Sequence, residues 1–420
     1  MKYIIKGGRE LGGKVRVQGA KNSVLPILAA TLLSNDKCEI LDCPHLSDVK
    51  TTTEILKELG CRVTYGLNTI SVDPTDAFNM EIPERLMRKL RSSIVFLGAV
   101  TMRVGQARLS MPGGCPLGTR PIDLHLKALK SLGIKVKEEA GFIETDASEA
   151  KNANVHLAFP SVGATENTIL AAVKIKGESV ITNAAREPEI IDLIAFLNAM
   201  GARITGGGTG TIHIDGVASL RGISYRIIPD RIAATTYMCM AMATGGEIEL
   251  ENVRREHLTA ITNELREEGA RVEFFGDRGY IRAPRKIKSA DMIKTMPYPG
   301  FPTDAQSVFI PHLVKGDSTS VIVENIFENR FRVVEEINKM GADIVTEGRS
   351  AIIRGPKRLV GAHVHAPDLR GGAALLIAAL SAQGESVVED VGHIQRGYEN
   401  VVENITALGG DIRINNTADY

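Results

Sequence analysis

The chain has 420 residues, of which 44% are hydrophobic and 24% charged, and its 50 basic side chains balance 50 acidic ones. This composition is typical of a soluble globular protein with more than one domain. The zero formal net charge excludes a general attraction to nucleic acid or to an anionic membrane, so an anionic ligand would need locally placed cations. The absence of a signal-peptide pattern and of a membrane-length apolar run predicts a cytoplasmic protein without membrane insertion.

The first strand expected in the chain, at residues 3–8, is followed by a pattern that recurs six times. In each copy an amphipathic helix ends at a glycine, spaced 68 to 73 residues from the next one, and a short strand follows: Gly60, Gly133, Gly201, Gly269, Gly341 and Gly409. A glycine just after a helix favours a left-handed C′ position. Repetition at this period predicts six units of helix, strand, helix and strand, with the first strand completing a later unit.

Ala-rich helices precede most of these units, as in 24–33, 167–175, 233–244 and 372–382. They have no polar face for solvent, so we expect them to be buried. Helices packed inside sheets suit this pattern better than an open solenoid. The sequence predicts an α/β protein of two lobes with three units each, with the boundary near residues 224–234.

The first candidate site residues are Lys21 and Asn22, which open the helix at 21–33. A helix start offers free N–H groups and a positive dipole end, where an anion binds well. The alternative is that Asn22 or Ser23 caps the helix and Lys21 is solvated. The run 85–91 adds Arg91, although such runs are usually solvated faces.

The thiol of Cys115 lies in the loop "SMPGGCPLGTRPIDLHL", between a glycine and a proline that give little material to bury it. We expect it to be exposed, whereas Cys38, Cys43, Cys61 and Cys239 are expected to be structural. The five cysteines show no paired metal-ligand spacing and fit a reducing compartment.

Arginines beside glycine-rich turns recur at Arg120, Arg370 and Arg396, and together with Arg91 they favour a site for a small, multiply charged anion. Asp304 follows two prolines and occupies an expected N-cap position, for which capping alone is a sufficient explanation. Glu187 and Glu189 likewise open a helix and need no function.

Several of these motifs, in order over nearly the whole chain, resemble the UDP-N-acetylglucosamine 1-carboxyvinyltransferases: "GAKNSVLP", "LRSS", "PGGCPLGTRPIDLH", "SVGATEN", "NAAREPEI", "GFPTDAQ", "ENIFENRF", "DLRGGAAL" and "RGYEN". The resemblance implies an inside-out α/β barrel fold with two domains, each of three βαβαββ repeats, and an active site in the interdomain cleft. It implies one domain at 1–20 plus 230–420 and the other at 21–229.

The resemblance also implies a reaction in bacterial peptidoglycan synthesis. The enolpyruvyl group of phosphoenolpyruvate moves to the 3′-hydroxyl of UDP-N-acetylglucosamine, and phosphate leaves through a tetrahedral ketal intermediate. No cofactor or metal is implied. The two small-molecule substrates are the predicted partners, no nucleic-acid partner is predicted, and the sequence leaves protein partners open.

The matching motifs imply a role for each candidate residue. Those implied to bind phosphoenolpyruvate are Lys21, Asn22, Arg120, Arg370 and Arg396. Those implied to bind UDP-N-acetylglucosamine are Arg91, Arg120, Pro121, Ile122, Asp123, Leu124, Ser161, Val162, Asp304, Ile326 and Phe327. Lys21, Arg396, Asp304 and Cys115 are the implied catalytic residues.

In the implied mechanism Asp304 accepts the hydroxyl proton, and Cys115 is the general acid for the methylene carbon and the target of the epoxide fosfomycin. An unperturbed thiol is mostly protonated at pH 7, but the neighbouring Arg120 favours thiolate and covalent attachment, so the sequence leaves both open. Two other functions remain: a shikimate-pathway enolpyruvyl transferase, which the cysteine loop argues against, and a non-catalytic paralogue that binds a UDP-sugar.

Overall fold

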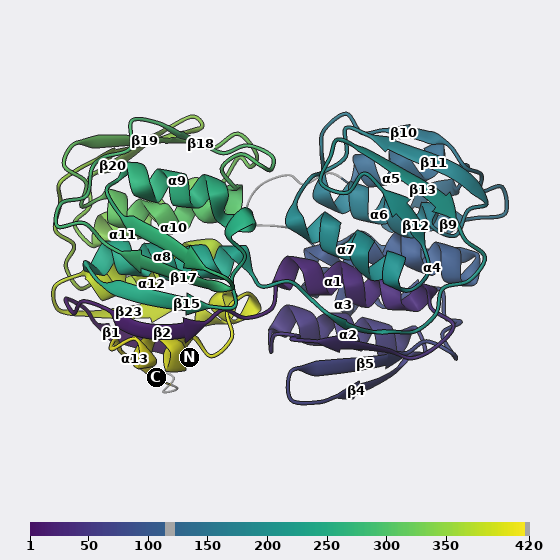
Figure 1. Ribbon diagram of the computed structural model, residues 1–420, viewed down its shortest axis with the longest axis horizontal. Helices are drawn as coiled ribbons and strands as arrows, with labels where there is room; N and C mark the ends of the chain where they lie inside the picture. The colour runs from purple at the N-terminus through teal and green to yellow at the C-terminus, as the bar shows by residue number, and fades with distance from the viewer. Residues whose placement is uncertain (114–121, 416–420) are drawn as a thin grey trace. The chain divides into compact units, whose positions relative to one another are not determined.

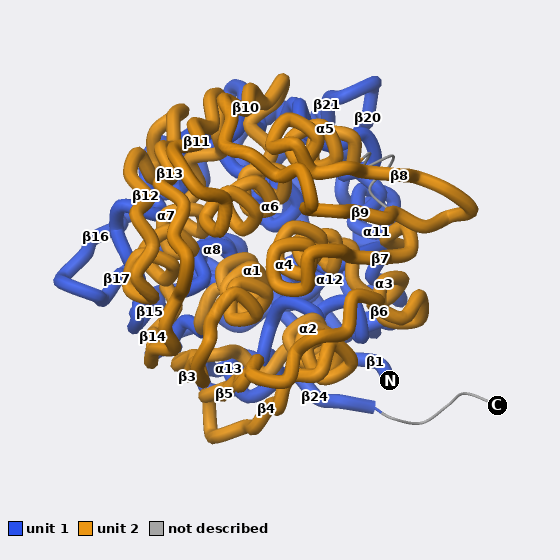
Figure 2. The backbone as a smooth tube through the Cα atoms, turned by 90° about the vertical axis from the view of Figure 1, so that its right-hand side faces the viewer, with its two compact units in different colours: residues 1–18, 116–118, 229–420 blue, residues 19–115, 119–228 orange. Residues whose placement is uncertain are grey.

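Helices and strands alternate along the chain in a computed structural model that describes residues 1–113 and 122–415 (Figure 1). The predicted α/β class is confirmed. The described residues form two compact units: unit 1 contains residues 1–18 and 229–415, and unit 2 contains residues 19–113 and 122–228 (Figure 2). Among the described helices, none is both long and apolar enough to cross a membrane.

Unit 1 is built from both ends of the chain. Its strands are β1 (Lys2–Lys6), β2 (Gly12–Arg16), β15 (Glu247–Glu251), β16 (Arg271–Phe275), β17 (Arg278–Arg282), β18 (Ile293–Lys294), β19 (Thr319–Val323), β20 (Ile344–Glu347), β21 (Ser350–Arg354), β22 (His363–His365), β23 (Glu385–Glu389) and β24 (Asp411–Asn415). Its helices are α8 (Arg231–Thr244), α9 (Thr259–Glu267), α10 (Thr303–Leu313), α11 (Val333–Lys339), α12 (Leu369–Ser381) and α13 (Val401–Ala407), with 3-10 turns η3 (Arg255–Leu258), η4 (Arg330–Arg332) and η5 (Val391–Arg396).

Unit 2 is built from the middle of the chain. Its strands are β3 (Cys38–Leu41), β4 (Arg62–Tyr65), β5 (Thr69–Asp73), β6 (Glu81–Ile82), β7 (Gln106–Ser110), β8 (Lys135–Glu139), β9 (Phe142–Asp146), β10 (Asn154–His156), β11 (Gly177–Thr182), β12 (Arg203–Thr205), β13 (Thr211–Gly216) and β14 (Ser224–Arg226). Its helices are α1 (Lys21–Ala30), α2 (Ser47–Glu58), α3 (Glu84–Lys89), α4 (Phe96–Val104), α5 (Asp123–Ser131), α6 (Val162–Ala172) and α7 (Pro188–Ala199), with 3-10 turns η1 (Thr31–Leu33) and η2 (Arg91–Val95).

The described strands form six four-stranded sheets, three in each unit, and all six have the same pairing pattern. An edge strand runs parallel to its neighbour, and the other two pairings are antiparallel, as in β22-β23-β1-β24 and β10-β11-β13-β12. Strand β1 lies between β23 and β24, with Tyr3 opposite Val388 and Ile414. The prediction that the first strand completes a later unit is therefore confirmed.

The six recurring glycines all have positive φ, between +73° and +110°. Each comes directly after the C-cap of a helix, as Gly60 follows Leu59 at the end of α2 and Gly341 follows Met340 at the end of α11. A β-carbon in this left-handed conformation is strained, so glycine ends the helix and turns the chain toward the next strand. The predicted C′ role of these glycines is confirmed.

Each unit has its own hydrophobic core, built around the Ala-rich helices. In unit 1, α8, α10 and α12 pack against one another, and every residue of α8 from Ile232 to Ala243 is buried. In unit 2, α1, α4 and α6 lie at the centre with the strands around them (Figure 2). Small side chains allow close helix packing on all sides, which explains the missing polar face. The prediction that these helices are buried is confirmed.

Candidate active site

Asp304 in unit 1 is the second residue of α10 and forms ion pairs with two arginines. One carboxylate oxygen accepts from Arg330 Nη2, and the other accepts from Arg370 Nη2 at 3.3 Å. Both arginines are 3% exposed. The expected N-cap role was wrong, because the N-cap of α10 is Pro302 and no side chain caps this helix. The carboxylate instead serves two buried cations, and an ion pair of this kind favours its charged form.

Arg370 is fixed by the start of its helix and by a tyrosine. Asp368 caps α12, and its carboxylate accepts from the backbone N–H groups of Arg370 and Gly371, both at 2.9 Å. Arg370 Nη1 donates to the Tyr398 hydroxyl at 3.0 Å. Burial alone would lower the pKa of Arg370, but Tyr398, Asp304 and Asp230 together outweigh burial and raise it. The guanidinium is therefore a permanent, positioned charge.

Glu324, which is 1% exposed, organises the neighbouring loop. Its Oε1 accepts from the backbone N–H groups of Ile326 at 2.8 Å and Phe327 at 3.1 Å. Its Oε2 accepts from the Thr303 hydroxyl at 2.9 Å, one residue before Asp304. These bonds bring the predicted residues Ile326, Phe327 and Asp304 into one cluster.

Arg396 lies at the end of η5, two residues before Tyr398. Gln18 holds this segment through two bonds: its amide donates to the Gly397 carbonyl at 3.0 Å and its carbonyl accepts from the Glu399 N–H at 2.9 Å. The predicted Arg370 and Arg396 thus come from elements that meet at Tyr398.

Lys21 in unit 2 is the first residue of α1 and is 9% exposed. Its ammonium forms an ion pair with the buried Asp48 at 2.7 Å. Neither alternative cap exists: the N-cap is Ala20 without a side-chain bond, and the Ser23 hydroxyl donates to Asp192. Asn22 follows as the second, half-buried residue of α1. Lys21 is therefore a positioned cation rather than a solvated one.

Several predicted UDP-sugar residues that the structure describes in unit 2 lie near His125 on α5. Burial, and then the nearby Arg91, lower the pKa of His125 to about 4, while Asp123 opposes that shift. The neutral ring accepts at Nδ1 from the Asn167 amide on α6 at 2.8 Å. Four more described residues of this set are at the starts of the same two helices: Ile122 is the N-cap of α5, Leu124 is in its first turn, Ser161 caps α6, and Val162 begins it.

Comparison with known proteins supports one family. A family model of EPSP synthase (3-phosphoshikimate 1-carboxyvinyltransferase) matches residues 5–405. UDP-N-acetylglucosamine 1-carboxyvinyltransferase 2 from Caldanaerobacter subterraneus subsp. tengcongensis is 49% identical over 98% of this chain and 99% of its own. UDP-N-acetylglucosamine 1-carboxyvinyltransferase 1 from Carboxydothermus hydrogenoformans is 47% identical over the full length of both.

The chain belongs to the UDP-N-acetylglucosamine 1-carboxyvinyltransferases of the EPSP synthase family. Its fold is also that of solved enolpyruvyl transferases. The enolpyruvyl transferase NikO from Streptomyces tendae superposes with a TM-score of 0.89, at 24% identity over 98% of both chains. EPSP synthase from Acinetobacter baumannii superposes with a TM-score of 0.74, at 16% identity over 98% of this chain and 99% of that one. The resemblance carried by the sequence motifs is confirmed.

Three predicted residues of this carboxyvinyltransferase, Cys115, Arg120 and Pro121, lie outside the described residues. The other four cysteines are buried free thiols. Burial raises the pKa of Cys43 and Cys61 to about 12 each, and it also raises that of Cys38 and Cys239. Their expected structural role agrees with this, since a buried thiol that stays protonated is a poor nucleophile.

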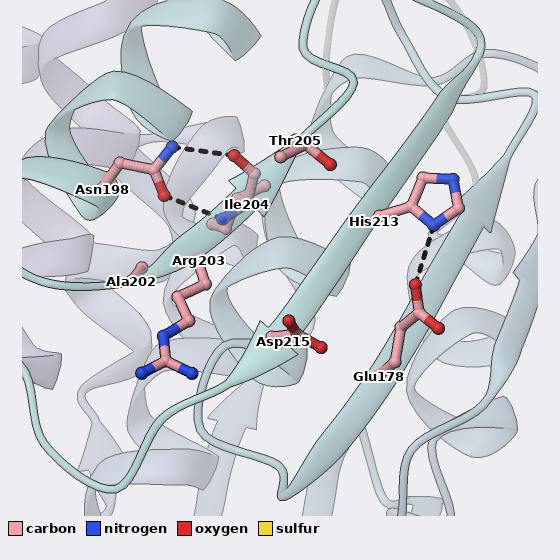
Figure 3. Close-up of a pocket in the computed structure, with 8 residues that line it drawn as sticks. All are labelled: Glu178, Asn198, Ala202, Arg203, Ile204, Thr205, His213 and Asp215. Atoms are coloured by element: carbon pink, nitrogen blue, oxygen red, sulfur yellow. Dashed lines mark hydrogen bonds and ion pairs between the residues drawn. The ribbon is translucent and has the colours of Figure 1, made fainter.

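A hollow of about 530 Å³ in unit 2 is lined by eight residues, none of which is a predicted site residue (Figure 3). It lies over the exposed face of β11, β12 and β13. Figure 3 shows His213 paired with Glu178, and the Asn198 amide bonded to the backbone of Ile204. His213 Nδ1 lies 3.0 Å from the Glu178 carboxylate. The His213, Glu178 and Asn198 side chains already bond to one another or to the backbone, so the candidate site residues remain the cluster around Asp304 in unit 1 and the cluster around Lys21 in unit 2.

Sequence analysis missed several residues of the candidate site. Arg330 stands inside the motif "ENIFENRF", and His125 ends "RPIDLH", so the matching motifs themselves could have suggested both. Glu324 begins the same motif as Arg330. Tyr398 stands inside the motif "RGYEN", which could likewise have suggested it. Asp48 carried no comparable signal, because only the fold brings it to Lys21.

Proposed function

We propose that this chain transfers the enolpyruvyl group of phosphoenolpyruvate to the 3′-hydroxyl of UDP-N-acetylglucosamine and releases phosphate, the first committed step of peptidoglycan synthesis. The observation that carries the proposal is the match over nearly the full length to carboxyvinyltransferases at 45–49% identity. The arrangement of charges around Asp304 and Lys21 supports it.

Phosphoenolpyruvate carries a phosphate and a carboxylate on three carbons, so its site needs several cations. We assign Lys21, Asn22, Arg120, Arg370 and Arg396 to this substrate. Lys21 and Arg370 are buried and held by partners, which keeps them in place before the substrate arrives. Each charged hydrogen bond contributes roughly 1.5–3 kcal/mol, so a few suffice to hold the anion and to favour domain closure.

Asp304 is the proposed acceptor for the proton of the 3′-hydroxyl. Its two arginine partners hold the carboxylate in position, and proton transfer would accompany the attack of the oxygen on C2 of phosphoenolpyruvate. The UDP-sugar would contact Arg91, Arg120, Asp304 and the segments 121–124, 161–162 and 326–327. The Glu324 carboxylate holds the segment 326–327 by accepting hydrogen bonds from its two backbone N–H groups.

Cys115 is the proposed acid that gives a proton to the methylene carbon, which forms the tetrahedral ketal. Loss of a proton from that carbon and of phosphate then yields the enolpyruvyl ether. Every step is addition or elimination, so the proposal includes no cofactor and no metal in the reaction.

We also propose the inside-out α/β barrel arrangement for both domains, at 1–20 plus 230–420 and 21–229, with the active site between them and the protein in the cytoplasm. The shared pairing pattern of the six described sheets and the buried inner helices support the barrel arrangement.

The test follows phosphate release by the purified chain with phosphoenolpyruvate and either UDP-N-acetylglucosamine or shikimate 3-phosphate. We expect release with the UDP-sugar only. Asp304→Asn should slow this release by about 10²-fold to 10⁴-fold, the usual range for the loss of a general base. The exposed Asp291→Asn is the matched control and should be fully active. Release with shikimate 3-phosphate would support the other transferase, and binding of both substrates without release would support a non-catalytic paralogue.

A second experiment tests the role of Cys115. Fosfomycin should label this cysteine, faster when UDP-N-acetylglucosamine is present, and peptide mass spectrometry would locate the adduct. Labelling of Cys43 or Cys61 instead, or of no cysteine, would contradict the assignment.

A further inference from the structure

Two histidines and a glutamate cluster on the outer face of the sheet β22-β23-β1-β24. His363 and His365 point to the same side of β22, since Val364 between them is buried, and Glu389 stands beside His365 in the parallel register with β23. His363 Nε2 lies 2.9 Å from one Glu389 oxygen, and His365 Nδ1 lies 3.5 Å from the other. Among the described residues, this is the one group of three or more His, Cys, Asp or Glu side chains whose ligand atoms all lie within 4.8 Å of one another.

These distances suit a tetrahedral metal ion. Nitrogen and oxygen ligands lie roughly 2.0–2.2 Å from Zn²⁺, so two ligand atoms of one tetrahedron are about 3.4 Å apart. The two imidazole rings are stacked, with their planes 15° apart and their centroids 5.5 Å apart, so both present a nitrogen to the same carboxylate. A small shift of the side chains would replace the two bonds to Glu389 by three bonds to one ion.

The surroundings add charge and rigidity. Asp390 places an oxygen 3.4 Å from His365 Nδ1, and it holds a left-handed backbone conformation with φ of +56°. Glu336 on α11 accepts from the backbone N–H of His365 at 2.9 Å, which fixes the end of β22. The donors thus stand on two paired strands, and the carboxylates supply the negative charge that a divalent cation needs.

We propose that His363, His365 and Glu389 form a binding site for one divalent transition-metal ion of the Zn²⁺ class, with water in the fourth position. Two imidazoles and one carboxylate favour Zn²⁺, Ni²⁺ or Cu²⁺ and disfavour Mg²⁺, which prefers oxygen ligands. The bound ion links the end of β22, which leads to α12, with the end of β23, which leads to η5. This site is separate from the proposed reaction, which uses no metal.

The test measures zinc bound per chain by equilibrium dialysis of the full-length, chelator-treated protein against ZnSO₄, with metal analysis of both sides. His363→Gln and Glu389→Gln should each bind one zinc ion fewer than the unsubstituted chain, or bind it more than about tenfold more weakly. Zinc held by other thiols or histidines is the same in every variant and cancels. In dialysis against MgSO₄, the unsubstituted chain should bind no more Mg²⁺ than His363→Gln or Glu389→Gln.

The matched control is His213→Gln, which removes a histidine from an exposed His–Glu pair on a sheet of unit 2. It should bind as much zinc as the unsubstituted chain. Equal zinc in His363→Gln and the unsubstituted chain would overturn the proposal, and so would an equal loss in His213→Gln, which would indicate adventitious binding by surface histidines. Far-UV circular dichroism checks folding, and His365→Gln serves as a third variant if one of the others unfolds.

Discussion

Substitution of Glu324 tests how the fold holds the proposed UDP-sugar loop. This buried carboxylate accepts four hydrogen bonds, from the Thr295 and Thr303 hydroxyls and from the N–H groups of Ile326 and Phe327, at 2.8 to 3.1 Å. Glu324→Gln keeps the shape of the side chain but removes its negative charge and puts an NH₂ donor in the place of one carboxylate oxygen. The Thr303 hydroxyl would then have to accept rather than donate.

The magnitude follows from the number of bonds. A hydrogen bond to a charged acceptor contributes roughly 1.5–3 kcal/mol and a neutral one roughly 0.5–1.5 kcal/mol, so three bonds to one oxygen lose about 1 kcal/mol each. The neutral amide recovers part of this because it costs less to bury than a carboxylate. We therefore expect Glu324→Gln to lower the free energy of unfolding by about 1–3 kcal/mol. The KM for UDP-N-acetylglucosamine should rise more than kcat falls, since the loop positions the substrate.

The assay combines urea unfolding with steady-state phosphate release at varied UDP-N-acetylglucosamine. The matched control is Glu347→Gln, an exposed glutamate on β20 of the same sheet, which should change neither quantity. If Glu324→Gln has the same urea midpoint and the same KM as Glu347→Gln, the four bonds do not support the loop and the reasoning is refuted.

Three further predictions concern other titratable or charged side chains that are buried or half-buried: His125, Glu264 and Asp48. Burial and the nearby Arg91 lower the pKa of His125 from its ordinary 6.5 to about 4, so the stability due to its neutral form is complete above pH 6.5 and is lost as the pH falls to 4. His125→Gln should reduce that loss by about 3 kcal/mol, measured by urea unfolding at pH 7 and pH 4, whereas His213→Gln should not. Burial raises the pKa of Glu264 from 4.5 to about 7, so ionisation of this carboxyl costs stability as the pH rises through 7. Glu264→Gln should therefore raise the melting temperature at pH 8 but not at pH 4. The gain at pH 8 should be equivalent to about 1 kcal/mol after allowance for solvent screening. Asp48→Asn removes the partner of Lys21 and should raise the KM for phosphoenolpyruvate, measured by phosphate release, while the KM for the UDP-sugar stays unchanged.

Much of the fold could be predicted because its signals are local. A glycine after an amphipathic helix needs only its own backbone to end the helix, and all six such glycines have positive φ. The Ala-rich helices were expected to be buried because their composition leaves them no polar face for solvent. Strand β1 was expected to complete a later unit because it stands before the first repeat and has no unit of its own, and it pairs with β23 and β24.

The partners of the site residues could not be predicted in the same way. Asp304 pairs with Arg330 and Arg370, which are 26 and 66 residues away, and a composition or spacing pattern does not report such a distance. The nearest local explanation, a helix cap, was physically reasonable and wrong. A short carboxylate at a helix start caps the helix only when no stronger cation competes for its oxygens, and here two buried guanidinium groups do.

The starts of the inner helices show why capping and function were difficult to separate. Ser161, Asp230 and Asp368 cap α6, α8 and α12 through their side chains, whereas α1, α4 and α10 have no side-chain cap. Lys21 and Asp304 stand in the first turns of α1 and α10. At α1 the positive end of the helix and the Lys21 ammonium add together, which suits the phosphate proposed there. The buried Asp48 balances Lys21 until an anion arrives, so the site remains stable without substrate.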